Sequence, residues 1–103
     1  MEINMKIELQ KDGENLIIKL EGRLETSTAP QLQEIAEKEI QDVTDLQIDM
    51  EQLEYVSSAG LRVLLFISKK MKAKQGNMSV CHVGEDIMEV FEITGFNDIL
   101  NIR

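Results

Sequence analysis

The order of strand-like and helical segments is the feature of this sequence that most constrains its fold. Two strand-like segments come first, Met5–Gln10 and Asn15–Leu20, and the Asp12-Gly13 pair between them is typical of a hairpin turn. Helical and strand patterns then alternate along the remaining chain. Because strands that are joined through helices run parallel, we expect a mixed α/β sheet with an N-terminal antiparallel hairpin and helices packed against it.

Three segments have the pattern of amphipathic helices. Apolar residues recur at helical spacing over Ala29–Ile40, and Thr28 followed by Gln31 matches a capping box at the start of this segment. The second helix is predicted from Ser58 to about Gln75, and the third opens at Gly84 and ends at Thr94-Gly95. Residues expected to be buried in the last two helices are Leu61, Leu64, Leu65, Ser68, Met71, Ile87, Val90, Phe91 and Ile93.

Two short segments between the helices are predicted to be strands. The first is Leu46–Met50, followed by a loop over residues 51–56, and the second is Asn77–Val83. The C-terminal segment, residues 96–103, has room for one short strand and no further helix. Sites in open sheets form beyond the carboxyl ends of strands, where helices begin. The Ser57-Ser58 pair lies at such a place.

Size, charge and cysteine content narrow the class of protein. The 103 residues, 43% of them hydrophobic, predict one domain over residues 1–103. A net charge of −8 disfavours nucleic acid as a partner, since phosphate binding needs a positive surface. No run of about 18 apolar residues is present, so we expect no membrane span. The N-terminal residues are charged and alternate between polar and apolar, which is unlike a signal peptide. The one cysteine, Cys81, cannot form an internal disulfide and fits a reducing compartment. Both features indicate a cytoplasmic protein.

Motifs for metals, cofactors and catalysis are weak. His82 follows Cys81 on a predicted strand, where neighbouring side chains point to opposite faces, so we expect no metal site. The sequence contains no Walker A or G-x-G-x-x-G motif, and no cofactor is predicted. A hydrolase would need Ser58 as nucleophile and His82 as base, and no glycine lies two residues before either serine. We therefore expect no enzymatic activity.

The segment "VSSAGLRVLLF" allows a structural and a regulatory interpretation. A serine that precedes a helix, here Ser58, caps it by accepting a backbone hydrogen bond, and Gly60 permits a tight turn or a close approach of another backbone. Alternatively, a phosphate on Ser58 would add a charge of about −1.5 to −2 at a helix N-terminus, which tolerates anions. Phosphorylation would then weaken the binding of a partner without unfolding the domain.

The second predicted helix has more apolar residues than one stripe requires. Val63, Phe66 and Ile67 widen its apolar face. Two layers of the protein can cover this wide face. Alternatively, Arg62, Val63 and Phe66 form part of a surface for a partner beside the serines.

These segments resemble the STAS domains of bacterial anti-sigma factor antagonists. The likeness rests on "YVSSAGLRVLL", preceded by "LQIDMEQLEY" and followed by "VFEITGF", and on the earlier "LEGRLETSTAPQL". It extends from about Leu16 to Ile102, and the sequence ends about where many members add a final helix. The resemblance implies a single STAS domain over residues 1–103, with a mixed sheet and helices on one side.

The resemblance also implies regulated protein binding. The unphosphorylated antagonist would bind an anti-sigma factor with serine kinase activity, which releases a sigma factor; phosphorylation would end this binding, and a serine phosphatase would restore it. Aligned on Gly60-Leu61, the phosphorylated serine of the family is Ser58. Ser57 and Ala59 stand where the family often has aspartate and serine, so Ser57 is the alternative acceptor. The partner-binding residues would be Glu25, Thr26, Ser57, Ser58, Gly60, Arg62, Val63 and Phe66.

STAS domains also occur without phosphorylation. The alternative interpretation is therefore a constitutive STAS scaffold, or a subunit of a signalling or transporter complex, in which the serines only cap a helix. The resemblance names neither a sigma factor nor an oligomeric state.

Overall fold

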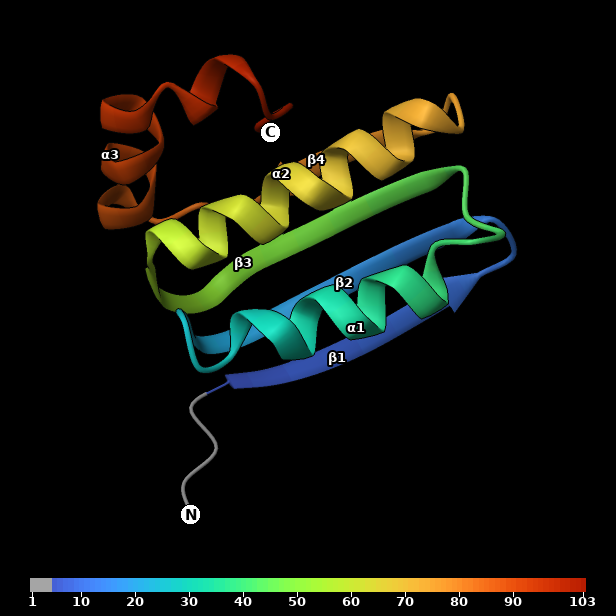
Figure 1. The fold of residues 1–103 in the computed structure, drawn as a ribbon, viewed down its shortest axis with the longest axis horizontal. Helices are drawn as coiled ribbons and strands as arrows, with labels where there is room; N and C mark the ends of the chain where they lie inside the picture. The colour runs from blue at the N-terminus through green and yellow to red at the C-terminus, as the bar shows by residue number, and fades with distance from the viewer. Residues whose placement is uncertain (1–4) are drawn as a thin grey trace.

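Four strands form one mixed sheet (Figure 1). The computed structural model describes residues 5–103. The N-terminal segment judged unlike a signal peptide starts at residue 1, so its first four residues lie outside the described part. Strands β1 (Met5–Asp12) and β2 (Asn15–Leu24) pair antiparallel, whereas β3 (Asp45–Val56) and β4 (Asn77–Cys81) continue the sheet in parallel, in the order β1-β2-β3-β4. The predicted mixed sheet with an N-terminal hairpin is confirmed.

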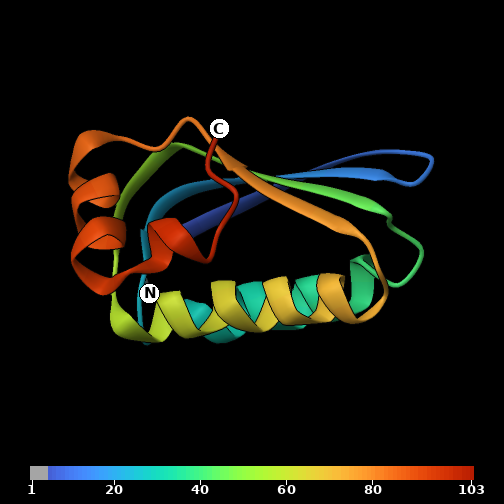
Figure 2. The same ribbon diagram turned by 90° about the horizontal axis from the view of Figure 1, so that it is seen from above.

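The two longest helices cover one face of this sheet. Helices α1 (Ala29–Glu39) and α2 (Ser58–Ala73) lie side by side beneath it in Figure 2. Helix α3 (Glu85–Thr94) lies at the end of the sheet where β3 leads into α2, and the short 3₁₀ helix η1 (Phe96–Asp98) follows it. The expected helices on one side are confirmed. None of the helices within residues 5–103 is long and apolar enough to cross a membrane.

Strands β3 and β4 differ in length from the prediction. Residues 51–56, expected to form a loop, continue β3 and pair with β2, where Leu24 is the partner of Val56. Register shifts in this half of the β2–β3 pair break the regular alternation of apolar residues, which is why the periodicity did not indicate a strand. Strand β4 ends at Cys81, short of the predicted Val83, because His82 has a left-handed backbone with φ 55°.

The start of α1 also differs from the prediction, because Thr28 does not form a capping box. Its Oγ1 accepts a hydrogen bond from the Glu25 N–H at 2.9 Å and donates one to the Arg23 carbonyl at 2.7 Å. The hydroxyl is thereby used to hold the turn between β2 and α1. Helix α1 begins without a side-chain cap.

Helix α2 buries a wider face than the predicted stripe. Val63 and Ile67 are buried because α2 packs against both the sheet and α1, which confirms the two-layer interpretation for these residues. Leu65 and Ser68, predicted to belong to the stripe, are only half-buried. The stripe residues that are buried as predicted are Leu61, Leu64 and Met71.

Helix α3 contributes less to the core than expected. Ile87 and Phe91 are buried and Val90 is half-buried, but Ile93 is 77% exposed, so the prediction for Ile93 is wrong. The left-handed Gly95, φ 82°, ends the helix as predicted. With ten residues and two buried side chains, this helix turns a narrow face toward the core.

The C-terminal residues return to the sheet beside β4. Ile102 forms a parallel bridge with Val80, whose N–H donates to the Asn101 carbonyl at 2.8 Å and whose carbonyl accepts from the Arg103 N–H at 2.8 Å. The predicted short strand is not formed; this one-residue bridge stands in its place. The expectation of no further helix in residues 96–103 is wrong, because Phe96–Asp98 form the 3₁₀ helix η1.

Gly60 lies where α2 meets the ends of β2 and β3, and this crowding gives a test of the fold. A Cβ at Gly60 would lie 2.7 Å from Leu24 Cγ and 2.9 Å from the Leu24 carbonyl oxygen. Because the carbonyl cannot rotate away, we expect Gly60→Ala to lower the free energy of unfolding by about 1–3 kcal/mol, measured by urea-induced unfolding.

Gly84→Ala is the matched control for this substitution. Gly84 also lies at the start of a helix, α3, and no described atom lies within 4 Å of the place that an added Cβ would occupy. The control should lose less than about 1 kcal/mol, the scale of a helix-cap effect. If the two variants lose equal free energy of unfolding, the close contact with Leu24 does not determine the cost of a side chain at residue 60.

Candidate partner-binding site at the start of helix α2

The two adjacent serines have different environments at the start of α2. Ser57 has an extended backbone, φ −99° and ψ 177°, and its Oγ accepts a hydrogen bond from the Gly60 N–H at 3.3 Å. Ser57 is therefore the N-cap, and the assignment of this role to Ser58 is wrong by one residue. Ser58 is the first residue inside the helix, and its side chain is exposed.

Backbone hydrogen bonds fix this junction to the end of β2. The Ser57 N–H donates to the Leu24 carbonyl at 2.9 Å, and the Ser57 carbonyl accepts from the Leu61 N–H at 2.9 Å. Ser57 is thus held on both sides, which places the neighbouring Ser58 on the surface at the end of the sheet. This is the position that sequence reasoning expected for a site in an open sheet.

An open cleft of about 470 Å³ lies between α1 and α2 beside the serines. Arg62 and Thr26 line it and are exposed, whereas Val63 lines it from a buried position. Glu34 and Glu37 from α1 bring carboxylates to the same cleft. The cleft therefore combines an apolar patch with charges of both signs, which suits a protein surface better than a small apolar ligand.

The turn between β2 and α1 forms the neighbouring part of the surface. Glu25 is half-buried, and its carboxylate lies 3.1 Å from Arg23 Nε. The guanidinium of Arg23 lies 4.3 Å from the centre of the Tyr55 ring, a distance typical of a cation–π contact. Sequence reasoning missed Arg23 and Tyr55. The only available signal was Tyr55 itself, the one tyrosine of the chain, in a segment that was predicted to be a loop.

The predicted partner-binding residues lie near one another but are not equally accessible. Gly60 and Val63 are buried, so they can shape the surface but offer little contact area. Phe66 is half-buried, and Lys70 Nζ lies 5.4 Å from the centre of its ring. Accessible side chains in this set are Thr26, Ser58 and Arg62.

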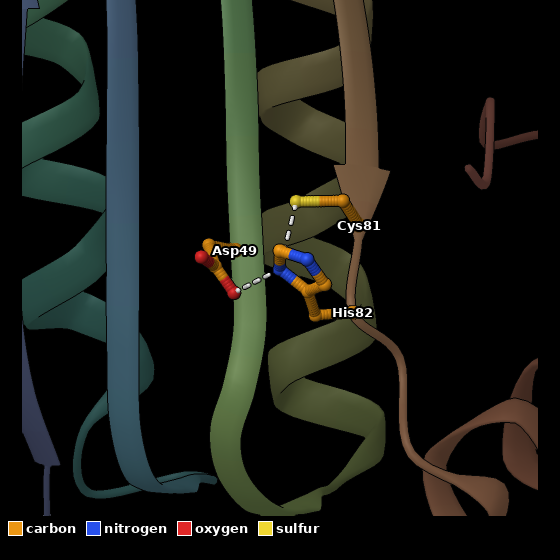
Figure 3. A group of neighbouring side chains, drawn as sticks. All are labelled: Asp49, Cys81 and His82. Carbon is orange, nitrogen blue, oxygen red and sulfur yellow. Dashed lines mark hydrogen bonds and ion pairs between the residues drawn. The ribbon is translucent and has the colours of Figure 1, made fainter.

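A second cluster lies on the opposite face of the sheet and corrects the prediction for Cys81 and His82. The left-handed backbone of His82 turns its ring back, so Cys81 Sγ lies 3.6 Å from His82 Nδ1 rather than on the other face (Figure 3). Asp49 Oδ1 lies 3.0 Å from the same nitrogen. The expected separation of the two side chains is wrong because it assumed regular strand geometry beyond Cys81.

Burial and hydrogen bonding shift two pKa values in this second cluster. Burial raises the pKa of the Cys81 thiol above its ordinary value. For Asp49, partial burial acts to raise the pKa, but hydrogen bonds from the Glu51 N–H and His82 outweigh it, so the pKa of this carboxyl lies below its ordinary value. At neutral pH the cluster therefore contains a carboxylate and a protonated thiol.

Comparison with known proteins agrees with the resemblance. Residues 6–103 match the STAS domain family. The putative anti-sigma factor antagonist BtrV of Bordetella bronchiseptica is 35% identical over 99 residues, which cover 95% of this chain and 85% of BtrV. The anti-sigma-B factor antagonist of Listeria monocytogenes is 28% identical over 103 residues, which cover 98% of this chain and 90% of that protein.

Solved structures show the same fold. The unphosphorylated form of the anti-sigma factor antagonist SpoIIAA superposes with a TM-score of 0.81 at 21% identity, covering 95% of this chain and 88% of SpoIIAA. The phosphorylated form of SpoIIAA from Bacillus gives a TM-score of 0.76 at 20% identity, covering 95% and 91%. These structures show the fold; the match over residues 6–103 and the 35% identity with BtrV show that the chain belongs to the STAS domain family.

Proposed function

We propose that this chain is a cytoplasmic anti-sigma factor antagonist that acts by binding and not by catalysis. In its unphosphorylated form it binds an anti-sigma factor with serine kinase activity and thereby releases a sigma factor. Phosphorylation of Ser58 ends this binding, and a serine phosphatase restores it. The names of its relatives support the proposal, since BtrV and the Listeria protein are both called anti-sigma factor antagonists.

The difference between the two serines is the observation that carries the proposal. A kinase must bring the acceptor hydroxyl to its ATP, so the hydroxyl has to be accessible. Ser57 is half-buried, and its Oγ already accepts a hydrogen bond from the Gly60 N–H. Ser58 is exposed at the same end of the sheet, so it is the better acceptor.

A phosphate on Ser58 is compatible with the fold. The first N–H groups of a helix have no partner within the helix, and its dipole favours an anion there. Arg62 lies one helical turn after Ser58, at the spacing where side chains of a helix meet. We infer that a phosphate on Ser58 pairs with Arg62, because guanidinium and phosphate form strong charge-assisted hydrogen bonds.

This pairing gives phosphorylation two effects on a bound partner. The phosphate adds bulk and negative charge beside the cleft between α1 and α2, and it also engages Arg62, which lines that cleft. A partner that uses Arg62 as a contact therefore loses the contact and meets a repelling charge. Both effects act on binding and neither requires the domain to unfold.

Phosphate transfer tests the assignment of Ser58. When the protein is incubated with ATP and the anti-sigma factor kinase encoded in the same genome, intact mass spectrometry should show the addition of one phosphate. We expect Ser58→Ala to abolish this addition and Ser57→Ala to retain it. No transfer to the wild type would favour a constitutive STAS scaffold, and transfer that survives Ser58→Ala would move the acceptor to Ser57.

Unfolding in urea tests the two structural roles. We expect Ser57→Ala to lower the free energy of unfolding by about 1 kcal/mol, because the N-cap acceptor is lost. Ser58→Asp should change it by less than about 1 kcal/mol, since an acidic residue at the start of a helix is favoured by the dipole. The reverse order of the two losses would contradict the assignment of Ser57 as the cap.

Binding to the same anti-sigma factor tests the cleft. We expect Arg62→Ala to raise the Kd by about tenfold or more, as for a central arginine of an interface. Lys72→Ala is the matched control, an exposed cation in the last turn of the same helix, and should leave the Kd within about threefold. Equal effects of both substitutions would indicate general electrostatic attraction in place of a specific contact.

A further inference from the structure

We propose that Asp49, Cys81 and His82 form a binding site for Zn²⁺. The cluster lies on the face of the sheet that α1 and α2 do not cover, as Figure 3 shows with the helices behind the strands. Its three ligand atoms are a sulfur, a nitrogen and an oxygen, and all lie within 4.8 Å of one another. The proposal is independent of the function proposed for Ser58.

The backbone brings the three side chains to one side. Asp49 and Cys81 are register partners in the parallel pair of β3 and β4, so their side chains project from the same face of the sheet. In a regular strand His82 would point to the opposite face. Its φ of 55° turns the ring back toward the other two, and this conformation is uncommon for a residue with a side chain. An unusual backbone thus completes the cluster.

Two distances in the cluster are close to those between ligands of a tetrahedral zinc ion, and the sulfur and the oxygen lie within 4.8 Å of each other. With bonds of about 2.3 Å to sulfur and 2.0–2.1 Å to nitrogen, two tetrahedral ligands lie about 3.6 Å apart. Cys81 Sγ and His82 Nδ1 are 3.6 Å apart. The separation of His82 Nδ1 and Asp49 Oδ1 is 3.0 Å, and it needs to widen by only about 0.4 Å to reach the tetrahedral value for nitrogen and oxygen.

The same geometry argues against a catalytic triad. In a triad the imidazole uses one nitrogen toward the nucleophile and the other toward the carboxylate. Here Cys81 and Asp49 both approach Nδ1 of His82, so the ring cannot pass a proton between them. The sulfur, the nitrogen and the oxygen are instead close enough together to be ligands of one metal ion.

Neighbouring groups orient the proposed ligands. Gln47 Nε2 donates to Cys81 Sγ at 2.9 Å, and the Glu51 N–H donates to Asp49 Oδ1 at 3.0 Å. Such outer contacts hold the ligands of metal sites in place. The His82 side chain is 58% exposed, so an ion can enter from solvent and keep a water molecule in its fourth position. Binding of Zn²⁺ releases the thiol proton of Cys81 to solvent, and the resulting set of thiolate, imidazole and carboxylate suits Zn²⁺.

Titration of the metal-free, reduced full chain with Zn²⁺ tests the proposal. Calorimetry should show one ion bound per chain, and the bound ion should raise the Tm, since it stabilises the folded state. Co²⁺, used as a spectroscopic probe, should give a thiolate-to-metal charge-transfer band. Absence of Zn²⁺ binding by the wild-type chain would overturn the proposal.

Variants locate the ion. Cys81→Ser should remove the charge-transfer band, and His82→Gly should weaken Zn²⁺ binding by more than about 100-fold, beyond the roughly 10–100-fold loss typical of an outer contact. Glycine tolerates the left-handed backbone of His82, so this variant should remain folded. Glu54→Gln removes an exposed carboxylate of β3 outside the cluster and should leave binding unchanged. Equal binding by all three variants would place the ion on other carboxylates and overturn the proposal.

Discussion

The close contact between the start of α2 and the ends of β2 and β3 is the constraint on which the rest of the structure depends. Gly60 has no side chain, and this allows the helix to approach Leu24 and Val56. The approach brings the Ser57 N–H within 2.9 Å of the Leu24 carbonyl. The same contact therefore joins the helical layer to the sheet and leaves Ser58 on the surface.

The order and type of the elements could be predicted because each long element has a strong pattern of its own. The helical spacing in α2, the hairpin signal at Asp12-Gly13 and the glycine after α3 are all local features of the sequence. Features that depend on contacts between elements could not be predicted in this way. Residues 51–56 form a strand because β2 lies beside them, although their own alternation is irregular.

The sequence indicated where a partner-binding site would lie, and that site stays a prediction. The resemblance indicated the serines, yet only the structure distinguishes them, since the hydrogen bond from Gly60 to Ser57 depends on the exact residue at which the helix begins. Cys81 and His82 were separated by the rule that side chains alternate along a strand. That rule fails at a residue with positive φ, and although histidine is more frequent there than most residues, a histidine in a sequence does not identify such a backbone.

The two edges of the sheet differ in how they are protected. At one edge, Asn101 and Arg103 occupy both hydrogen-bonding groups of Val80, so the C-terminal residues act as a short cover for β4. At the other edge, β1 is exposed for most of its length but carries Lys6, Glu8 and Lys11. Charged side chains on an edge strand hinder pairing with a second chain. The two edges of the sheet thus limit association through the strands in different ways, one edge by covering β4 and the other by the charges of β1.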